Sequence, residues 1–204
     1  MSSDAWILGR PMSMQADSTI LMDPPWNERG GGKIKRGADK HYDLVKTRDM
    51  PRVIYNSGVW RPASDCHLYM WATNNHLPDA LWLMDLLGFR YKTNVVGTKG
   101  RIGLGQYFRG QHELLLFGVR GSGFKVKTDD RTIKSWVHAK RGKHSAKPSE
   151  FYELIEARSC GPYLEMFARD SRDGWDSWGS EVTHTPQINK LIIQAQLTGM
   201  KDDD

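Results

Sequence analysis

The hydrophobic pattern of the first hundred residues predicts an alternation of strands and helices. Thr19-Ile20-Leu21-Met22 is an apolar run that stops at two prolines, which is typical of a strand buried on both faces. Residues 68–72 form a second run of this kind. From Pro78 to a stop at Gly88, apolar side chains recur at helical spacing. Residues 89–96 return as a strand, so we predict a strand-helix-strand unit of the type that builds parallel sheets.

The second half of the chain continues the pattern. Residues 114–119 predict a strand, and Pro148 begins a helix that carries an apolar face and ends at Cys160-Gly161-Pro162. Residues 163–167 predict the final strand. We therefore expect one α/β domain over residues 1–182, with a mostly parallel sheet flanked by helices.

Polar, glycine-rich or basic stretches separate these elements. Residues 27–41, 97–112 and 121–147 predict loops. After residue 182 we expect a C-terminal tail over 183–204. Its apolar spacing predicts a short amphipathic helix over residues 187–198, followed by a disordered acidic end.

Charge is the compositional feature that bears on function. The formal net charge is +5, and basic residues cluster in two of the loops. Solvated loops would explain such clusters, but their grouping favours a polyanionic partner. The first cluster comprises Lys33, Lys35, Arg36 and Lys40, and the second comprises Lys134, Lys140, Arg141, Lys143 and Lys147.

Several classes of protein are disfavoured. Cys66 and Cys160 have no metal-ligand spacing, and no histidine pairs with another ligand at zinc-binding spacing, so we expect no metal. The chain has neither a signal-peptide pattern nor an apolar run long enough to span a bilayer. We expect a cytoplasmic protein with no membrane partner.

The most informative motif is Asp23-Pro24-Pro25-Trp26, directly after the first strand. Ligands of open α/β sheets bind at the carboxyl ends of strands. Two prolines stiffen the backbone, so a carboxylate and a carbonyl that is free of ladder bonds are held at one spot. Two such acceptors can orient an aromatic amino group and direct its lone pair at an electrophile. Trp26 offers a ring on which a base can stack, although a structural turn with a core tryptophan would give the same string.

The chain resembles the MT-A70 family of adenine N6 methyltransferases from about Ile20 to Val182. The resemblance rests on collinear motifs in the same order as in the family. They are Asp23–Trp26, His67–Thr73 with Leu87-Gly88-Phe89, Gly105–Glu113 with Val119-Arg120-Gly121, Ser145–Pro148, Leu164–Arg169 and Gly174–Glu181.

This resemblance implies a Rossmann-like methyltransferase fold, S-adenosyl-L-methionine as cofactor and direct methyl transfer to adenine. It makes Asp23, Pro24, Pro25 and Trp26 the catalytic residues. For cofactor binding it implies Asp23, His112, Phe167, Arg169 and the pair Ser180-Glu181, where the family usually has Asn in place of the serine. His112 is equally consistent with a structural histidine. The residues that we expect to contact the substrate are Trp26, Lys33, Lys35, Arg36, Lys99, Arg101, Tyr107 and Arg109.

We therefore predict methylation of the exocyclic N6 amine of adenine in nucleic acid. The size of the chain favours DNA; an RNA adenosine N6 methyltransferase is the alternative. A non-catalytic nucleic-acid-binding protein with the same fold is a rival of another class, and a small-molecule methyltransferase is a third reading that the basic loops disfavour. Lys147 either orients the turn before its helix or contacts a phosphate. The resemblance is also compatible with a homodimer.

Overall fold

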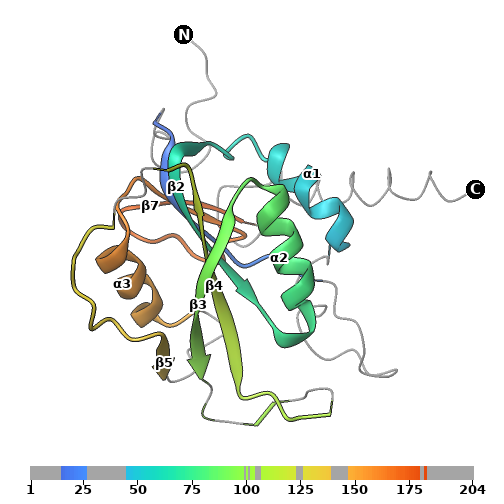
Figure 1. Cartoon of the computed structure of the whole chain (residues 1–204). Coiled ribbons are helices and arrows are strands. Elements are labelled where there is room, and N and C mark those ends of the chain that lie inside the picture. The colour runs from blue at the N-terminus through green and yellow to red at the C-terminus, as the bar shows by residue number, and fades with distance from the viewer. Residues whose placement is uncertain are drawn as a thin grey trace, which may run out of the picture.

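The computed structural model places most of the chain in one layered α/β unit (Figure 1). It describes residues 15–26, 45–98, 100, 102–103, 107–122, 126–138, 147–179 and 182.

The described strands form one sheet of seven, in the order β5-β3-β4-β2-β1-β6-β7. β4 runs antiparallel to both of its neighbours, and the other described pairs are parallel. The mostly parallel sheet is thus confirmed, as is the Rossmann-like methyltransferase fold class. The strands are β1 (Asp17–Met22), β2 (Pro62–Ala72), β3 (Arg90–Thr98), β4 (His112–Arg120), β5 (Trp136–His138), β6 (Tyr163–Met166) and β7 (Trp175–Trp178).

Helices cover both faces of this sheet. α1 (Met50–Tyr55) and α2 (Leu77–Leu86) lie on one face, and α3 (Ser149–Arg158) lies on the other (Figure 1). The 3-10 turns Thr47–Asp49 and Asn74–His76 precede α1 and α2. α2 has a proline in its first turn. The chain turns out of the helix at Gly88, whose φ of +82° is a conformation that glycine adopts without strain.

Alternate residues of the central strands pack into two separate hydrophobic cores, one on each face of the sheet. Ile20 and Met22 pack towards α1 and α2, while Leu21 packs towards α3. β2 divides in the same way, with Met70 on the first side and Trp71 on the second. Full burial of each such side chain contributes about 1.5–3 kcal/mol, which explains the uninterrupted apolar runs of β1 and β2.

The strand-helix-strand unit differs from the expectation in its pairing. β2 and β3 run in the same direction but are not neighbours, because β4 inserts between them antiparallel to both. Nor is β6 the final strand, since β7 follows it at the sheet edge. The sequence Trp-Asp-Ser-Trp of β7 is too short and polar to read as a strand, and α1 and β5 are likewise short elements that the pattern did not predict.

The register brings the ends of β1 and β6 together beside β2. Met22, the last residue of β1, pairs with Met70 of β2 and with Met166 of β6. The residues that follow β1 and β6 therefore leave the sheet side by side at its carboxyl edge. No helix in the described part of the chain is long and apolar enough to cross a membrane. The boundary at residue 182 stays a prediction, because the tail over 183–204 lies outside the described residues.

Candidate active site

Asp23 is held at the carboxyl edge by the neighbouring strand. Its backbone N–H donates to the carbonyl of Met166 at 3.3 Å, which extends the β1–β6 pairing by one residue. The expectation of carbonyls free of ladder bonds is wrong for Pro25, next to the Trp26–Val45 bridge, whereas the bond to Pro24 is a local turn. The Trp26 N–H donates to the Pro24 carbonyl at 2.8 Å, and the Val45 N–H donates to the Pro25 carbonyl at 3.2 Å. Each carbonyl oxygen has two lone pairs and so retains one for a ligand.

Lys147 is the direct partner of the Asp23 carboxylate. Its Nζ lies 3.1 Å from Oδ2 of Asp23 and 3.5 Å from Oε2 of Glu113, and 4.4 Å from the centre of the Trp71 ring. Burial of the ammonium lowers the pKa of Lys147, but attraction to the two carboxylates outweighs this effect and leaves that pKa above its ordinary value. Lys147 is therefore a fixed cation that orients the carboxylate of Asp23.

A second carboxyl group, that of Glu165, lies in the same site. Glu165 belongs to β6 and is buried, and its Oε1 accepts a hydrogen bond from the hydroxyl of Tyr152 at 2.9 Å. Burial raises the pKa of Glu165 to about 7; the Tyr152 bond opposes this rise and the charge of Asp23 adds to it. The carboxyl group of Glu165 thus changes its charge near neutral pH.

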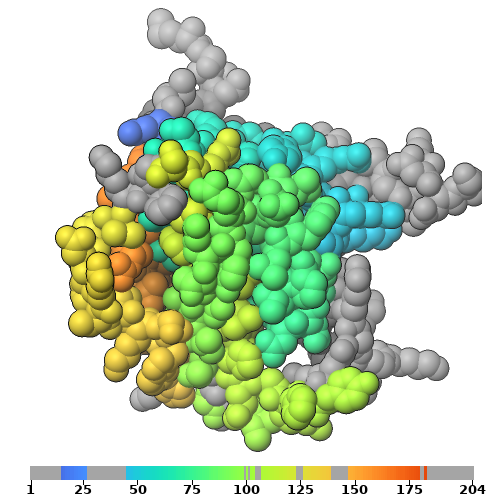
Figure 2. Space-filling view, in the orientation of Figure 1, coloured from blue at the N-terminus to red at the C-terminus, as the bar shows by residue number. Residues whose placement is uncertain are grey.

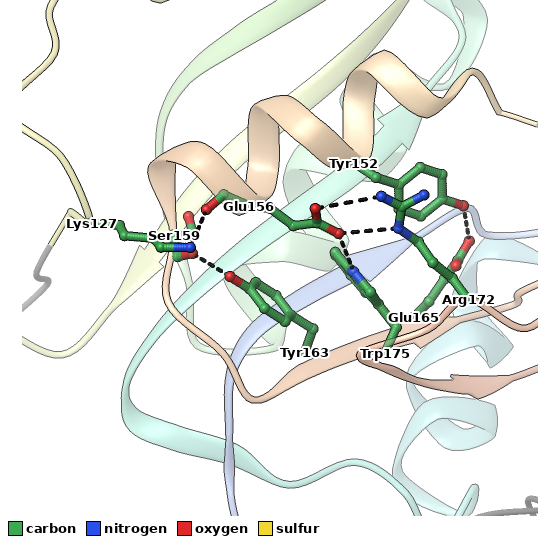
Figure 3. A network of polar contacts seen from close by, with 8 residues as sticks. All are labelled: Lys127, Tyr152, Glu156, Ser159, Tyr163, Glu165, Arg172 and Trp175. Carbon is green, nitrogen blue, oxygen red and sulfur yellow. Dashed lines mark hydrogen bonds and ion pairs between the residues drawn. The ribbon is translucent and has the colours of Figure 1, made fainter.

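Side chains of α3, of the β6–β7 connection and of β7 form a polar network around Glu165 and Tyr152 (Figure 3). The guanidinium of Arg172 lies 4.6 Å from the centre of the Tyr152 ring and forms an ion pair with Glu156 at 3.1 Å. Glu156 also accepts a hydrogen bond from the Trp175 indole at 2.8 Å. These contacts tie α3 to β7 and fix the position of the Tyr152 ring.

Phe167 turns the chain at the end of β6. Its φ is +61°, a left-handed conformation that a non-glycine residue adopts only under strain, and such strain is concentrated at functional sites. The Phe167 ring packs edge-on against Trp178, with the two ring centres 5.5 Å apart. The next residue, Ala168, donates its N–H to the Trp178 carbonyl at 3.0 Å. A Cβ on Gly179 would collide with the Ala168 carbonyl, so only glycine fits there.

These groups surround a cavity of about 370 Å³. Its wall combines carboxylates, cations and the two aromatic rings of Tyr152 and Phe167, so it suits a ligand that carries charges of both signs and a flat apolar part. The structure therefore brings together three of the predicted site residues, Asp23, Phe167 and Arg169. The lining residues are Asp23, Lys147, Tyr152, Glu165, Phe167, Arg169, Asp170, Ser171, Arg172 and Asp173.

Trp26 points away from the cavity into the core. Its side chain is 6% exposed, its indole N–H donates to the Trp71 carbonyl at 3.1 Å, and its ring stacks on His76. Trp26 thus has a structural role in the part of the chain that the structure describes. Its predicted role as a stacking surface for the base stays a prediction.

The other predicted residues lie along the same edge or outside the described residues. His112 is the exposed first residue of β4, and Tyr107 and Arg109 lie exposed in the β3–β4 connection. The remaining candidates are not in the described residues: Lys33, Lys35, Arg36, Lys99, Arg101, Ser180 and Glu181.

Sequence reasoning missed Glu113, Tyr152, Glu165 and Arg172, and it left Lys147 open. One signal was available, because Glu165 is a charged residue inside an otherwise apolar strand. The contact partners of Lys147 gave no such signal, since they come from separate elements. Across the described ranges, no group of three or more potential metal ligands comes together.

Comparison with known proteins shows which family of sequences the chain matches. A family model described as MT-A70 matches residues 18–181. The type II methyltransferase M.MunI of Mycoplasma sp. is 30% identical to this chain, over 87% of the chain and 81% of its own length.

Two eukaryotic proteins are similar at lower identity. The mouse N(6)-adenine-specific methyltransferase METTL4 is 24% identical over 85% of this chain, which spans 39% of the mouse protein. The N6-methyladenosine RNA methyltransferase MTA1 of Pyricularia oryzae is 23% identical over 86% of this chain, which spans half of the fungal protein.

Proposed function

The chain belongs to the MT-A70 family, and we propose that it is an adenine N6 methyltransferase that transfers the methyl group of S-adenosyl-L-methionine to adenine in DNA. The observation that carries the proposal is the carboxylate of Asp23, which lines the cavity, is held by Lys147 and directly follows β1 as Phe167 directly follows the neighbouring strand β6. The similarity to M.MunI supports the reaction and favours DNA as the acceptor.

The lining of the cavity fits S-adenosylmethionine. That cofactor carries a carboxylate, an ammonium, a sulfonium, a ribose diol and an adenine ring. Arg169 and Arg172 can hold the carboxylate, while Glu165 and Asp170 can hold the cationic groups. Phe167 provides a ring against which the adenine of the cofactor can pack. When bound, the cofactor supplies an electrophilic methyl group on sulfur.

Asp23 acts on the acceptor amine. The exocyclic amine of adenine is a poor nucleophile, because its lone pair is delocalised into the ring. In the proposed mechanism the two N–H groups of the amine donate hydrogen bonds to the Asp23 carboxylate and to the remaining lone pair of the Pro24 carbonyl. This arrangement favours a pyramidal nitrogen with its lone pair directed at the cavity. Lys147 holds the carboxylate in place. The same carboxylate can accept the proton that the nitrogen loses after methylation.

RNA is the second candidate acceptor. Its support is the similarity to the fungal protein whose name specifies RNA, which is weaker in identity and coverage than the similarity to M.MunI. A homodimer is also part of the proposal.

A transfer assay distinguishes these possibilities. Labelled S-adenosylmethionine is incubated with the protein and duplex DNA, single-stranded DNA or RNA, and the products are identified by nucleoside mass spectrometry. N6-methyladenine in DNA is the expected product, and the Asp23→Ala variant should form none while melting at the wild-type temperature. Methylation of RNA alone would show that RNA, and not DNA, is the acceptor. Folded protein that neither methylates nor binds the cofactor would favour the alternative of a non-catalytic nucleic-acid-binding protein.

A further inference from the structure

The β3–β4 connection presents two adjacent aromatic side chains to solvent. Tyr107 is 102% exposed and Phe108 is 85% exposed, and Ile102 on the same connection is 68% exposed. A single exposed apolar side chain is ordinary, but adjacent exposed apolar side chains on one connection form a patch of the kind that marks an interaction site. Figure 2 shows the described part of this connection projecting at the lower edge of the molecule.

The backbone holds these side chains outward. The Gly103 N–H donates to the Gly110 carbonyl at 2.8 Å, which closes the base of the connection and leaves Tyr107 and Phe108 at its tip. Tyr107 has a φ of 59°, the left-handed conformation that is strained for a tyrosine. Strain of this kind persists where the conformation has a function.

The tip lies close to the site of methyl transfer. Glu113 follows Phe108 by five residues, and its carboxylate shares the ammonium of Lys147 with Asp23. Five residues span at most about 17 Å, or about five base steps of DNA. Phe108 therefore lies within about 17 Å of Glu113, which contacts Asp23 through Lys147, so a duplex bound at Asp23 can also contact this connection.

The charge of the connection identifies the partner. Residues 99–111 include Lys99, Arg101 and Arg109 and contain no acidic residue. A surface made for another protein would not need such a one-sided charge, whereas a phosphate backbone does. Aromatic and aliphatic side chains flanked by cations are the means by which proteins insert between base pairs and unstack them.

We propose that Phe108, with Tyr107 beside it, inserts into duplex DNA next to the target and occupies the space that the adenine leaves. An enzyme that modifies a base in a duplex must bring that base out of the stack, and an inserted side chain prevents it from returning. This inference rests on the proposed function and narrows its substrate to double-stranded DNA.

The test compares native plasmid DNA from a methylation-deficient host with the same DNA after heat denaturation. Phe108→Ala should lower methylation of native DNA by about tenfold, the loss typical of removing one stacking contact, and leave methylation of denatured DNA within about twofold. Phe108→Leu should retain most activity, because leucine also serves as a wedge. Trp82→Ala removes an exposed aromatic from α2 and is the matched control.

A second readout follows the unstacking itself. Permanganate oxidises unstacked thymine, so wild-type protein should make the thymine opposite the target reactive and Phe108→Ala should not. Equal losses on native and denatured DNA, or no loss on either, would overturn the wedge. A change in oligomeric state together with equal losses would assign the tip to contact between copies and would also overturn it. If the wild-type protein methylates neither native nor denatured DNA, the proposed function itself, and not only the wedge, is contradicted.

Discussion

The ammonium of Lys147 lies 3.1 Å from the carboxylate of Asp23, closer than its second carboxylate partner, Glu113, at 3.5 Å. Asp23 follows β1 and Lys147 precedes α3, so the ion pair joins two elements at the edge of the cavity. Its geometry assigns Lys147 the task of fixing the direction of the Asp23 oxygens.

We therefore expect Lys147→Met to lower kcat/KM by about a hundredfold, the typical effect of removing one preorganised charge from an active site. Lys147→Arg, which keeps the charge, should retain more activity. Glu113→Gln serves as the matched control and should have a smaller effect, because its contact with Lys147 is longer. If Glu113→Gln costs as much as Lys147→Met, the cation acts through both carboxylates and not mainly through Asp23.

Trp26 gives a prediction about stability. Trp26→Ala should reduce the free energy of unfolding by about 3–5 kcal/mol, because it removes a buried ring and leaves a cavity. Trp26→Phe keeps a ring beside His76 but removes the donor to the Trp71 carbonyl, so a loss of about 1 kcal/mol is expected. Chemical denaturation measures both values. A large rise in KM of folded Trp26→Phe would show that the ring also serves the base.

The sequence predicted the position of Asp23 well and the surroundings of Asp23 poorly. An apolar run ended by two prolines places Asp23 at a strand end from local information alone. The contact between Lys147 and Glu113 spans 34 residues and depends on β4 lying beside β2. The apolar run of β4 indicates a buried strand but contains nothing that sets its direction or its neighbours, so the site around Lys147 could not be assembled from the pattern. A motif gives the residue and not the direction of its side chain, so the packing of Trp26 on His76 could not be predicted from the sequence.

Glu165 predicts a pH dependence of cofactor binding. Its pKa of about 7 means that the carboxyl group gains a negative charge as the pH rises from 6 to 8. S-adenosylmethionine carries a positive sulfonium, so its affinity should increase over this interval. Titration calorimetry at several pH values measures the effect, and Glu165→Gln should flatten it. An affinity of the wild type that is constant from pH 6 to 8 would place the sulfonium away from Glu165.

Asp17 predicts a pH dependence of stability. It is 1% exposed, and within the described residues neither carboxylate oxygen has a hydrogen-bond partner. Burial raises its pKa to about 7, with Arg61 opposing the shift and Asp176 adding to it. The folded protein therefore keeps a proton that the unfolded chain loses above about pH 4, so stability falls as the pH rises from about 4 to about 7.

The substitution Asp17→Asn removes this titration. It should stabilise the fold by about 1–3 kcal/mol at pH 8, where the wild type holds an unpaired buried charge, and have little effect at pH 4. Thermal denaturation at the two pH values measures the difference. Asp85→Asn, on the exposed face of α2, is the control and should be neutral at both. Equal melting temperatures of Asp17→Asn and wild type at pH 8 would contradict the assignment.

The basic run that follows Trp26 predicts the salt dependence of DNA binding. Lys33, Lys35 and Arg36 lie outside the described residues, but they follow Trp26 within ten positions. Each contact between a cation and a phosphate releases counterions and contributes about one unit to the slope of log K against log salt. Replacing all three residues with glutamine should therefore reduce that slope by up to about three units and weaken binding at low salt, with cofactor affinity unchanged. Fluorescence anisotropy over a salt series measures the slope. A variant of equal charge, with glutamine at Lys46, Arg52 and Lys92, is the control, because these residues belong to neither basic cluster. If the two triple variants have the same slope, general charge and not this segment determines the attraction to DNA.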